Sequence, residues 1–252
     1  MRRDHPGSVI LSGMKPTDLL NEVIEAHGGH ARWRDVDTIE ASFSSGGLAF
    51  SLHLQPLALR GLRVSLRPHA RHLVLHGYCH EGWSGVWTPA HVRILDERGT
   101  LIAERRDPRA SFARFDMQFR WDKLDLLYFA GYALWNYLSF PFVLQEPGVT
   151  LIESAGDTAS DQLRVRFDPD LPTHSADQTF HVDGARLLKR HDYTADVIGH
   201  WAKAANFCLA SEQVECLRFY TRRRVYPRIG ARTVLPMPTL VWIEIDAIRL
   251  SR

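Results

Sequence analysis

The stretch WDKLDLLYFAGYALWNYLSFPFVL, residues 121–144, is the longest apolar run of the chain. It is about as long as a membrane span. However, Asp125 and Asn136 lie inside the run and Pro141 near its end, and a carboxylate in the hydrocarbon core of a membrane is costly. The strand-like segments on both sides would also lack a membrane-compatible partner. We therefore predict a buried helix covered by the concave face of a sheet, in preference to an integral membrane span.

Three aromatic residues of this run, Tyr128, Tyr132 and Trp135, follow one another at spacings of four and three. Residues at these spacings share one face of a helix. Such a stripe can pack in the core, line a ligand cavity, or do both. We therefore treat all three as candidate ligand-binding residues.

The segments around the apolar run show the period-two alternation of β-strands. The Asp183-Gly184 pair is typical of a hairpin turn, and short consecutive strands favour an antiparallel arrangement. Strands are expected at residues 38–43, 48–54, 59–66, 70–77, 85–87, 91–96, 101–105, 149–153, 162–167, 178–182, 186–193, 205–214, 217–225 and 240–248.

Two shorter helical segments precede these strands. One begins at Pro16 and ends before Gly28-Gly29, and a second helical turn at residues 31–35 would point Trp33 inward. A sheet of this many strands tends to curl. We expect an α+β fold: a strongly curved antiparallel sheet, or incomplete β-barrel, wrapping an N-terminal helix and the central apolar helix. Residues 1–14 are expected to be a flexible tail and residues 15–252 a single domain.

The overall composition is that of an ordinary globular protein, with 45% hydrophobic and 24% charged residues. The formal net charge of +2 argues against a dedicated nucleic-acid binder. Cys79, Cys208 and Cys216 are too few and too scattered for a disulfide framework or a CxxC metal site. The apolar part of the N-terminus, residues 9–11, is too short for a signal-peptide core. These features predict a cytoplasmic protein with reduced thiols.

The start of the chain resembles the lipoprotein-carrier superfamily, which has the LolA/LolB-like fold. The resemblance rests on Ala26-His27-Gly28-Gly29, Trp33 and Thr38-Ile39-Glu40-Ala41, and on the strand-turn-strand pattern of residues 167–193. It implies a half-barrel whose space between sheet and helices takes an acyl chain or another apolar ligand. The chain lacks the family's signal peptide and lipobox cysteine, which argues against periplasmic lipoprotein transport. The violacein-biosynthesis protein VioE is similar in fold and is a cytosolic enzyme without a cofactor.

The segment His191-Asp192-Tyr193 is a candidate site on a predicted strand. His191 and Tyr193 would face one side, as candidate ligand-binding residues, and Asp192 the other. An inward Asp192 would have a raised pKa and could act as an acid or base. Alternatively, its carboxylate would pair with an arginine of residues 222–224.

The run Arg222-Arg223-Arg224 lies on another predicted strand. Alternation places Arg222 and Arg224 on one face and Arg223 on the other, and an inward arginine could hold a ligand carboxylate. We treat Arg222 and Arg224, with Asp192, as candidate catalytic residues. The other interpretations are a charged sheet edge that prevents aggregation and, less favoured, a membrane-surface or nucleic-acid patch.

Two further constellations favour ordinary structural roles. Thr173-His174-Ser175-Ala176-Asp177 contains Ser, His and Asp, but adjacent residues do not converge as a triad, so a turn held by side chains is expected. His72 and His76 would share one face of a strand, without the further ligands of a zinc site. We predict no metal and no cofactor.

Two functions remain as hypotheses. The first is a cytosolic protein that holds an apolar or aromatic small molecule, or an acyl chain, between sheet and helix. The second is a cofactor-free enzyme of secondary metabolism that uses the same cavity, as VioE does. A scaffold whose interior is filled by its own side chains is the third interpretation.

Overall fold

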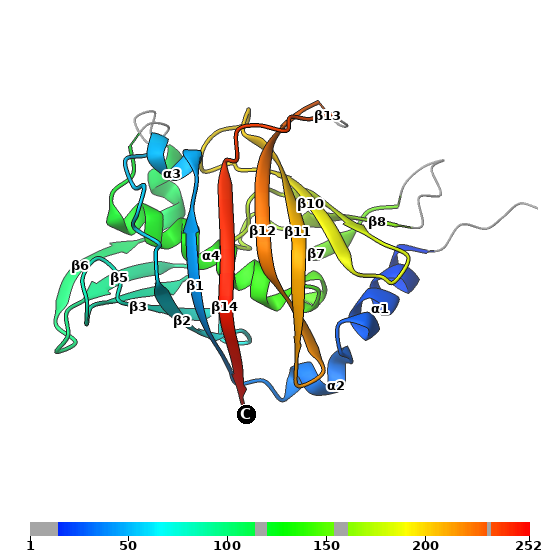
Figure 1. Ribbon diagram of the computed structural model, residues 1–252, viewed down its shortest axis with the longest axis horizontal. Coiled ribbons are helices and arrows are strands. Elements are labelled where there is room, and N and C mark those ends of the chain that lie inside the picture. Colours follow the sequence, from blue (N-terminus) through cyan, green and yellow to red (C-terminus); the bar gives the residue numbers. More distant parts are fainter. Residues whose placement is uncertain (1–14, 114–119, 154–160, 231–232) are drawn as a thin grey trace, which may run out of the picture.

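The computed structural model describes residues 15–113, 120–153, 161–230 and 233–252 (Figure 1). The tail predicted at residues 1–14 lies outside this part. The described strands are β1 Thr38–Gly46, β2 Leu62–Arg67, β3 His72–His76, β4 Ser84–Thr88, β5 His91–Leu95, β6 Leu101–Arg106, β7 Val149–Leu151, β8 Gln162–Phe167, β9 Asp177–Val182, β10 Leu188–Thr194, β11 Lys203–Val214, β12 Leu217–Ile229, β13 Thr233–Val234 and β14 Val241–Ser251.

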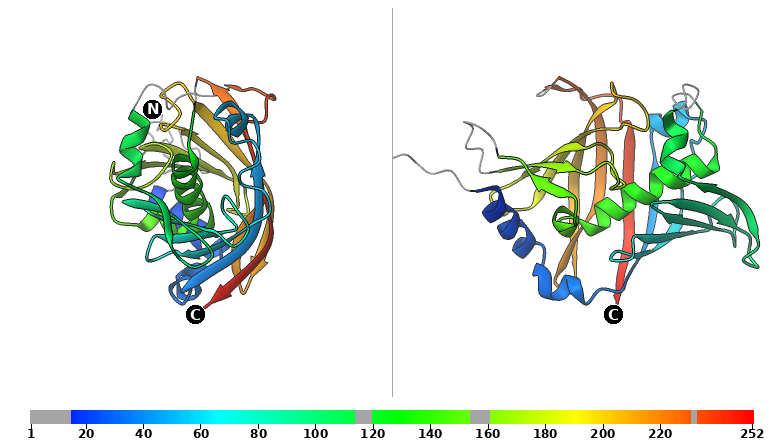
Figure 2. Two further views of the ribbon diagram at one scale, coloured as in Figure 1. Left: turned by 90° about the vertical axis from the view of Figure 1, so that its left-hand side faces the viewer. Right: turned by 180° about the vertical axis from the view of Figure 1, so that it is seen from behind.

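Over the described residues these strands form one 14-stranded sheet in the order β6-β5-β4-β3-β2-β1-β14-β12-β11-β10-β9-β8-β7, with β13 added beside β12. The pairings along this order are antiparallel. The last strand, β14, lies between β1 and β12, so that the first and last strands pair at the centre of the sheet. The sheet curves around one side of the central helix and does not close on itself (Figure 2). The predicted fold class is confirmed.

The apolar run forms helix α4, Lys123–Ser139, followed by the 3-10 helix η3, Phe142–Gln145. Every residue from Leu124 to Ser139 is buried. Gly131 lets the helix approach the sheet, because a Cβ atom there would lie 2.2 Å from the Cγ of Trp87. In the described residues no helix is both long and apolar enough to cross a membrane.

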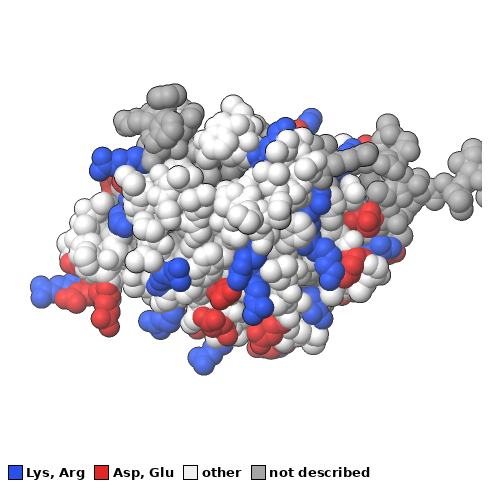
Figure 3. All heavy atoms as spheres, turned by 45° about the horizontal axis from the view of Figure 1, so that its top comes forward, with Lys and Arg blue, Asp and Glu red and all other residues white. Residues whose placement is uncertain are grey.

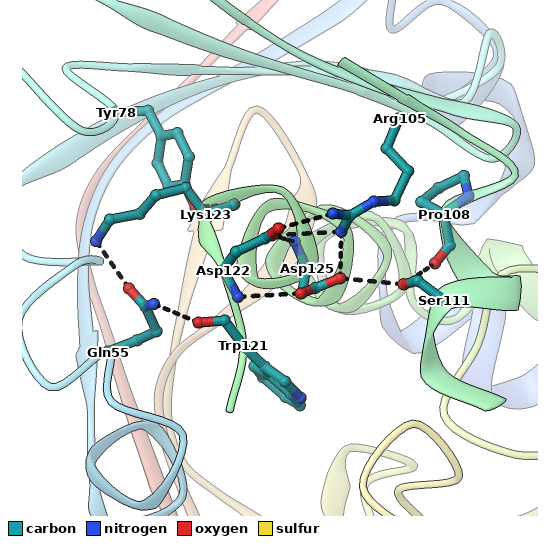
Figure 4. A network of polar contacts seen from close by, with 9 residues as sticks. All are labelled: Gln55, Tyr78, Arg105, Pro108, Ser111, Trp121, Asp122, Lys123 and Asp125. Atoms are coloured by element: carbon teal, nitrogen blue, oxygen red, sulfur yellow. Dashed lines mark hydrogen bonds and ion pairs between the residues drawn. The ribbon is translucent and has the colours of Figure 1, made fainter. Parts of the chain in front are cut away.

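Asp125 lies inside the apolar run because its carboxylate takes part in capping the N-terminus of α4 (Figure 4). The Asp125 N–H donates to the Asp122 carboxylate at 2.9 Å, and the Asp122 N–H donates to the Asp125 carboxylate at 3.0 Å. This reciprocal pair is a capping box, which satisfies two unpaired donors of the first helical turn. Arg105 of β6 forms ion pairs with both carboxylates, and Ser111 donates to Asp125 at 3.0 Å. The network therefore anchors the helix against the β6 side of the sheet.

The N-terminal helices α1, Pro16–Ala26, and α2, Gly29–Arg34, pack beside strands β8 and β12. The His27 ring contacts the Val23 carbonyl oxygen through Nδ1 at 2.6 Å and the Tyr220 hydroxyl through Nε2 at 2.8 Å. Gly28 has φ +107°, and a Cβ atom there would lie 2.3 Å from the Cys216 carbonyl oxygen. The His-Gly pair of the motif thus joins α1 to β12.

One predicted element has a different type in the structure. Residues 48–54, predicted as a strand, begin with helix α3, Leu48–Leu52. The reason is that Ala49 and Phe50 are buried on one side while Leu48 and Leu52 are exposed, which is helical rather than alternating burial. Two short elements lie outside the predicted ones: the 3-10 helix η1, Pro108–Ala113, and the strand β13.

Candidate ligand-binding site

A small apolar cavity lies on the concave side of the sheet, between α4 and the central strands β1 and β14. Its volume is about 30 Å³, which is room for about two water molecules. The side chains that line it come from six segments of the chain: Phe43, Ser45, Phe50, Leu59, Phe129, Ala130, Ala133, Leu134, Tyr137, Tyr193, Val241 and Ile243.

Small side chains on α4 create this space. Ala130 and Ala133 lie three apart on the helix and both line the cavity, so they share a helix face. The Ser45 hydroxyl donates to the Trp242 carbonyl at 2.8 Å and so is already satisfied. The other lining side chains are apolar, except for the hydroxyls that Tyr137 and Tyr193 carry.

Behind those two hydroxyls lies a buried polar cluster centred on His174. The His174 Nε2 is 2.8 Å from the Tyr137 hydroxyl, and its Nδ1 is 3.2 Å from the Tyr132 hydroxyl. Its ring stacks on Tyr193 at a centroid distance of 3.8 Å. Burial, reinforced by the nearby charges of Arg109 and Arg223, lowers the pKa of His174 to about 3. The imidazole is therefore neutral near pH 7, with one nitrogen as donor and the other as acceptor.

His191 extends the cluster toward β9. Its Nε2 is 2.6 Å from the Gln178 Oε1, and its ring stacks on Phe180 at 4.1 Å. The Gln178 amide also donates to the Ser175 carbonyl at 2.7 Å and to the Thr173 hydroxyl. Burial holds the pKa of His191 well below its ordinary value, so this histidine is neutral as well.

Arg223 brings a positive charge into this neutral cluster. Its side chain is only 1% exposed. The guanidinium lies over the rings of Tyr137 and Tyr220, at 4.4 and 5.3 Å from their centroids. One terminal nitrogen donates to the Cys208 sulfur at 3.1 Å.

The three aromatic residues predicted to form one stripe on α4 lie in different surroundings. Tyr132 joins the His174 cluster. Tyr128 lies beside Tyr132, at a centroid distance of 5.4 Å, and Trp135 donates to the Pro68 carbonyl at 3.1 Å. None of the three lines the cavity described above, which opens on a different face of the helix.

Of the strand β10 candidates, His191 and Tyr193 point into the concave side and stand 4.9 Å apart, centroid to centroid. Asp192 does not point inward. Its carboxylate accepts hydrogen bonds from Arg190 at 2.7 Å, and it lies 3.2 Å from the His181 ring. Although burial opposes the change, these partners hold the pKa of Asp192 below its usual range. The interpretation of Asp192 as an inward carboxylate with a raised pKa is therefore wrong. The carboxylate pairs with Arg190, where an arginine of residues 222–224 was expected.

Arg222 and Arg224 lie on the opposite face from Arg223, as alternation predicts. Arg224 pairs with Glu244 of β14 at 2.6 Å, and Arg222 approaches the same carboxylate at 4.0 Å. Charged side chains of both signs gather on the lower part of the surface in Figure 3. Asp192, Arg222 and Arg224 are thus ion-paired outside the concave cluster, and Arg223 is the arginine inside it.

The histidines of β3 lie apart from this site. His76 contacts the Ser65 hydroxyl at 2.9 Å, and burial lowers the pKa of His72 and of His76. Within the described ranges no three His, Cys, Asp or Glu side chains are grouped to hold a metal ion.

Arg223 and His174, like Tyr137 and Gln178, were not among the predicted site residues. Arg223 was recognisable as the odd member of an alternating arginine run. His174 lies in the Thr173–Asp177 segment that was interpreted as a turn. The segment does contain turn-like bonds, such as Thr173 hydroxyl to Ser175 carbonyl at 2.9 Å, but the His174 ring turns into the core.

No protein-family model matches the sequence, and no curated protein matches it. Among solved structures, the chain is similar to a LolA superfamily protein from Nitrosomonas europaea, with a TM-score of 0.51, 8% identity, and coverage of 95% of this chain and 94% of that chain. It is also similar to a DUF1329 family protein from Desulfovibrio piger, with a TM-score of 0.50, 12% identity and 94% of each chain covered. At such identities the likeness concerns the fold alone. The chain therefore has a LolA-like fold, as the resemblance of its N-terminal motif predicted.

Proposed function

We propose that this protein binds an apolar or aromatic small molecule, or an acyl chain, between α4 and the concave face of the sheet. The observation that carries the proposal is the apolar cavity on that face, beside Ala130 and Ala133. The LolA-like fold is consistent with it, since a half-open sheet around a helix offers a concave, mostly apolar surface of the kind that small ligands occupy. The enzymatic alternative receives no support from the comparisons.

At about 30 Å³ the cavity is far smaller than a drug-sized pocket. A ligand would therefore bind by parting the side chains that line it, most directly at helix α3, whose Phe50 forms part of the wall.

Exposed apolar side chains lie on α3 and in the loops next to it, and they support access from there. Leu48 and Leu52 on α3 and Leu54 and Leu57 after it are all exposed. Met237 is exposed too, in the loop whose Leu240 carbonyl accepts a hydrogen bond from the Ala49 N–H at 2.9 Å. Clustered apolar surface of this kind marks sites of contact with apolar partners.

The test uses the neutral dye N-phenylnaphthylamine, whose fluorescence rises in apolar surroundings. We expect one saturable site in the wild-type protein and at least about tenfold weaker binding after Ala133→Phe, because the larger side chain fills the cavity. Ala247→Phe is the matched control, because Ala247 is exposed on β14, the strand that carries Val241 and Ile243. This variant should bind the dye like the wild type. Equal binding by the wild type and Ala133→Phe, with both folded by circular dichroism, would refute the proposed site.

Native mass spectrometry of the purified protein provides a second measurement. A co-purified apolar molecule that is absent from Ala133→Phe would support the proposal and identify the ligand.

Cytoplasmic location is part of the proposal. It is supported by the state of the three cysteines, all of which are free thiols, as expected in a reducing compartment. Fractionation of the native cells would test it.

A further inference from the structure

Arg223 stands beside the cavity on the concave face of the sheet. On β12 it is paired with Cys208 of β11 on one side and with Ile243 of β14 on the other. Ile243 lines the cavity, and so does Tyr137, whose ring lies under the guanidinium. The guanidinium is thus next to the wall of the proposed binding space.

The hydrogen-bonding capacity of this guanidinium is mostly unused. Arg223 Nε and Nη2 are buried and have no hydrogen-bond partner in the described part of the chain. Its other nitrogen contacts only the Cys208 sulfur, which is a weak acceptor. Among the described residues no Asp or Glu forms an ion pair with Arg223, in contrast to its neighbours Arg222 and Arg224.

The groups around Arg223 are neutral and do not balance its charge. Burial keeps the pKa of His174 and His191 low and raises the pKa of the Cys208 thiol and of the Tyr137 hydroxyl. The Asn206 amide faces Tyr137, but neither its oxygen nor its nitrogen has a hydrogen bond of ordinary geometry.

An unbalanced buried charge is expensive, because the protein interior solvates it poorly. The two rings offset part of that cost through cation–π attraction. A carboxylate would offset more, since its two oxygens match the planar fork of a guanidinium and accept two parallel hydrogen bonds. The unused Nε and Nη2 form one such edge of the fork.

We infer that the ligand is a carboxylic acid, with its carboxylate on Arg223 and its apolar body in the cavity between α4 and β1/β14. This inference rests on the proposed function and specifies the chemical class of the ligand. Tyr137 contacts both parts of the proposed site. The Arg223 guanidinium lies over its ring, and its side chain also lines the apolar cavity.

The test compares two amphiphiles of equal length, dodecanoate and dodecanol, as competitors of bound N-phenylnaphthylamine. In the wild type, dodecanoate should displace the dye at a concentration at least about tenfold lower, which corresponds to one charge-assisted hydrogen-bonded pair. Arg223→Met should abolish that preference and leave displacement by dodecanol unchanged. Arg222→Met, on the outer face, should retain the wild-type preference.

Equal displacement by the two amphiphiles in the wild type would overturn the inference while leaving the proposed function intact. Failure of the dye and of both amphiphiles to bind would instead remove the proposed function itself. The wild-type comparison needs no variant to fold. As a further check, Arg223→Lys keeps the charge but loses the fork, so it should retain only part of the preference.

Discussion

Replacing Arg223 by methionine should stabilise the ligand-free protein. The side chain is 1% exposed, and two of its three nitrogens lack a partner among the described residues. Methionine has a similar reach, carries no charge and adapts to irregular space. Most changes at buried positions destabilise, so a gain in stability would be an unusual and informative result.

The expected gain in the free energy of unfolding follows from the contacts that Arg223→Met loses and from the cost of burying the charge, which it removes. The variant loses two cation–π contacts, with Tyr137 at 4.4 Å and Tyr220 at 5.3 Å, together about 1–4 kcal/mol. It also loses the contact with the Cys208 sulfur, and it removes a buried-ion penalty of several kcal/mol. The balance favours a gain of about 1–2 kcal/mol, at the lower end of what apolar replacement of buried ionic groups yields.

Urea unfolding at pH 7, followed by circular dichroism, measures this gain directly. We expect a higher midpoint with an unchanged slope, and a melting temperature higher by about 2–4 °C for each kcal/mol. Arg222→Met should change stability by less than about 0.5 kcal/mol, because that side chain is 58% exposed. A loss of more than about 1 kcal/mol on Arg223→Met would refute the reasoning, since it would mean that the aromatic contacts outweigh the cost of burying the charge.

Three further predictions concern packing, pH and access. Gly131→Ala should destabilise the protein by about 1–3 kcal/mol in urea unfolding. The clash of the added methyl group with Trp87 outweighs a gain of about 1 kcal/mol in helix propensity. Equal or higher stability of the variant would contradict the close packing of α4 on Trp87. The unfolded chain protonates His27 below about 6.5, whereas burial lowers the folded-state pKa to about 4. His27 should therefore contribute about 3 kcal/mol to the loss of stability as pH decreases through this window, in addition to the contributions of His174 and His191. His27→Gln should make that profile shallower by this share in urea titrations at several pH values, and an unchanged profile would exclude His27 as a contributor. The double variant Leu52→Asp/Leu57→Asp changes two exposed side chains. It should slow dye uptake in stopped-flow fluorescence while its melting temperature stays within about 2 °C of the wild-type value. Unchanged uptake would exclude access at α3.

The sequence predicts the type of most elements because their burial follows regular periods. The apolar run is an almost fully buried helix, and the strand-like segments alternate as expected. The prediction of a strand at residues 48–54 is wrong because Leu48, Phe50, Leu52 and Leu54 follow the period-two alternation of a strand in the sequence. In the fold, Gly47 has φ +128° and the Leu48 N–H donates to the Thr239 carbonyl, so the chain leaves β1 at this point. That contact joins residues far apart in the sequence, and no local pattern reveals it.

The candidate site was only partly predictable for the same reason. Strand alternation correctly separates Arg223 from Arg222 and Arg224, but it does not say which face is the concave one. His174 comes from the irregular segment between β8 and β9, where neither helical nor strand spacing assigns a direction to a side chain. Its position becomes clear only when Tyr132 and Tyr137 of α4 are brought against that segment.

The different faces of α4 indicate which way the site would open. At its start the helix is held by Arg105 through Asp122 and Asp125. Along another face, Gly131 packs on Trp87, and Trp135 lies 6.4 Å from the same ring, centroid to centroid. The face with Ala130 and Ala133 instead lines the apolar cavity, and Phe50 of the five-residue helix α3 lines the same cavity. Because α4 is fixed on its other sides, a ligand would enter by displacing α3 and the side chains near it, and its carboxylate would then meet Arg223 at the far wall.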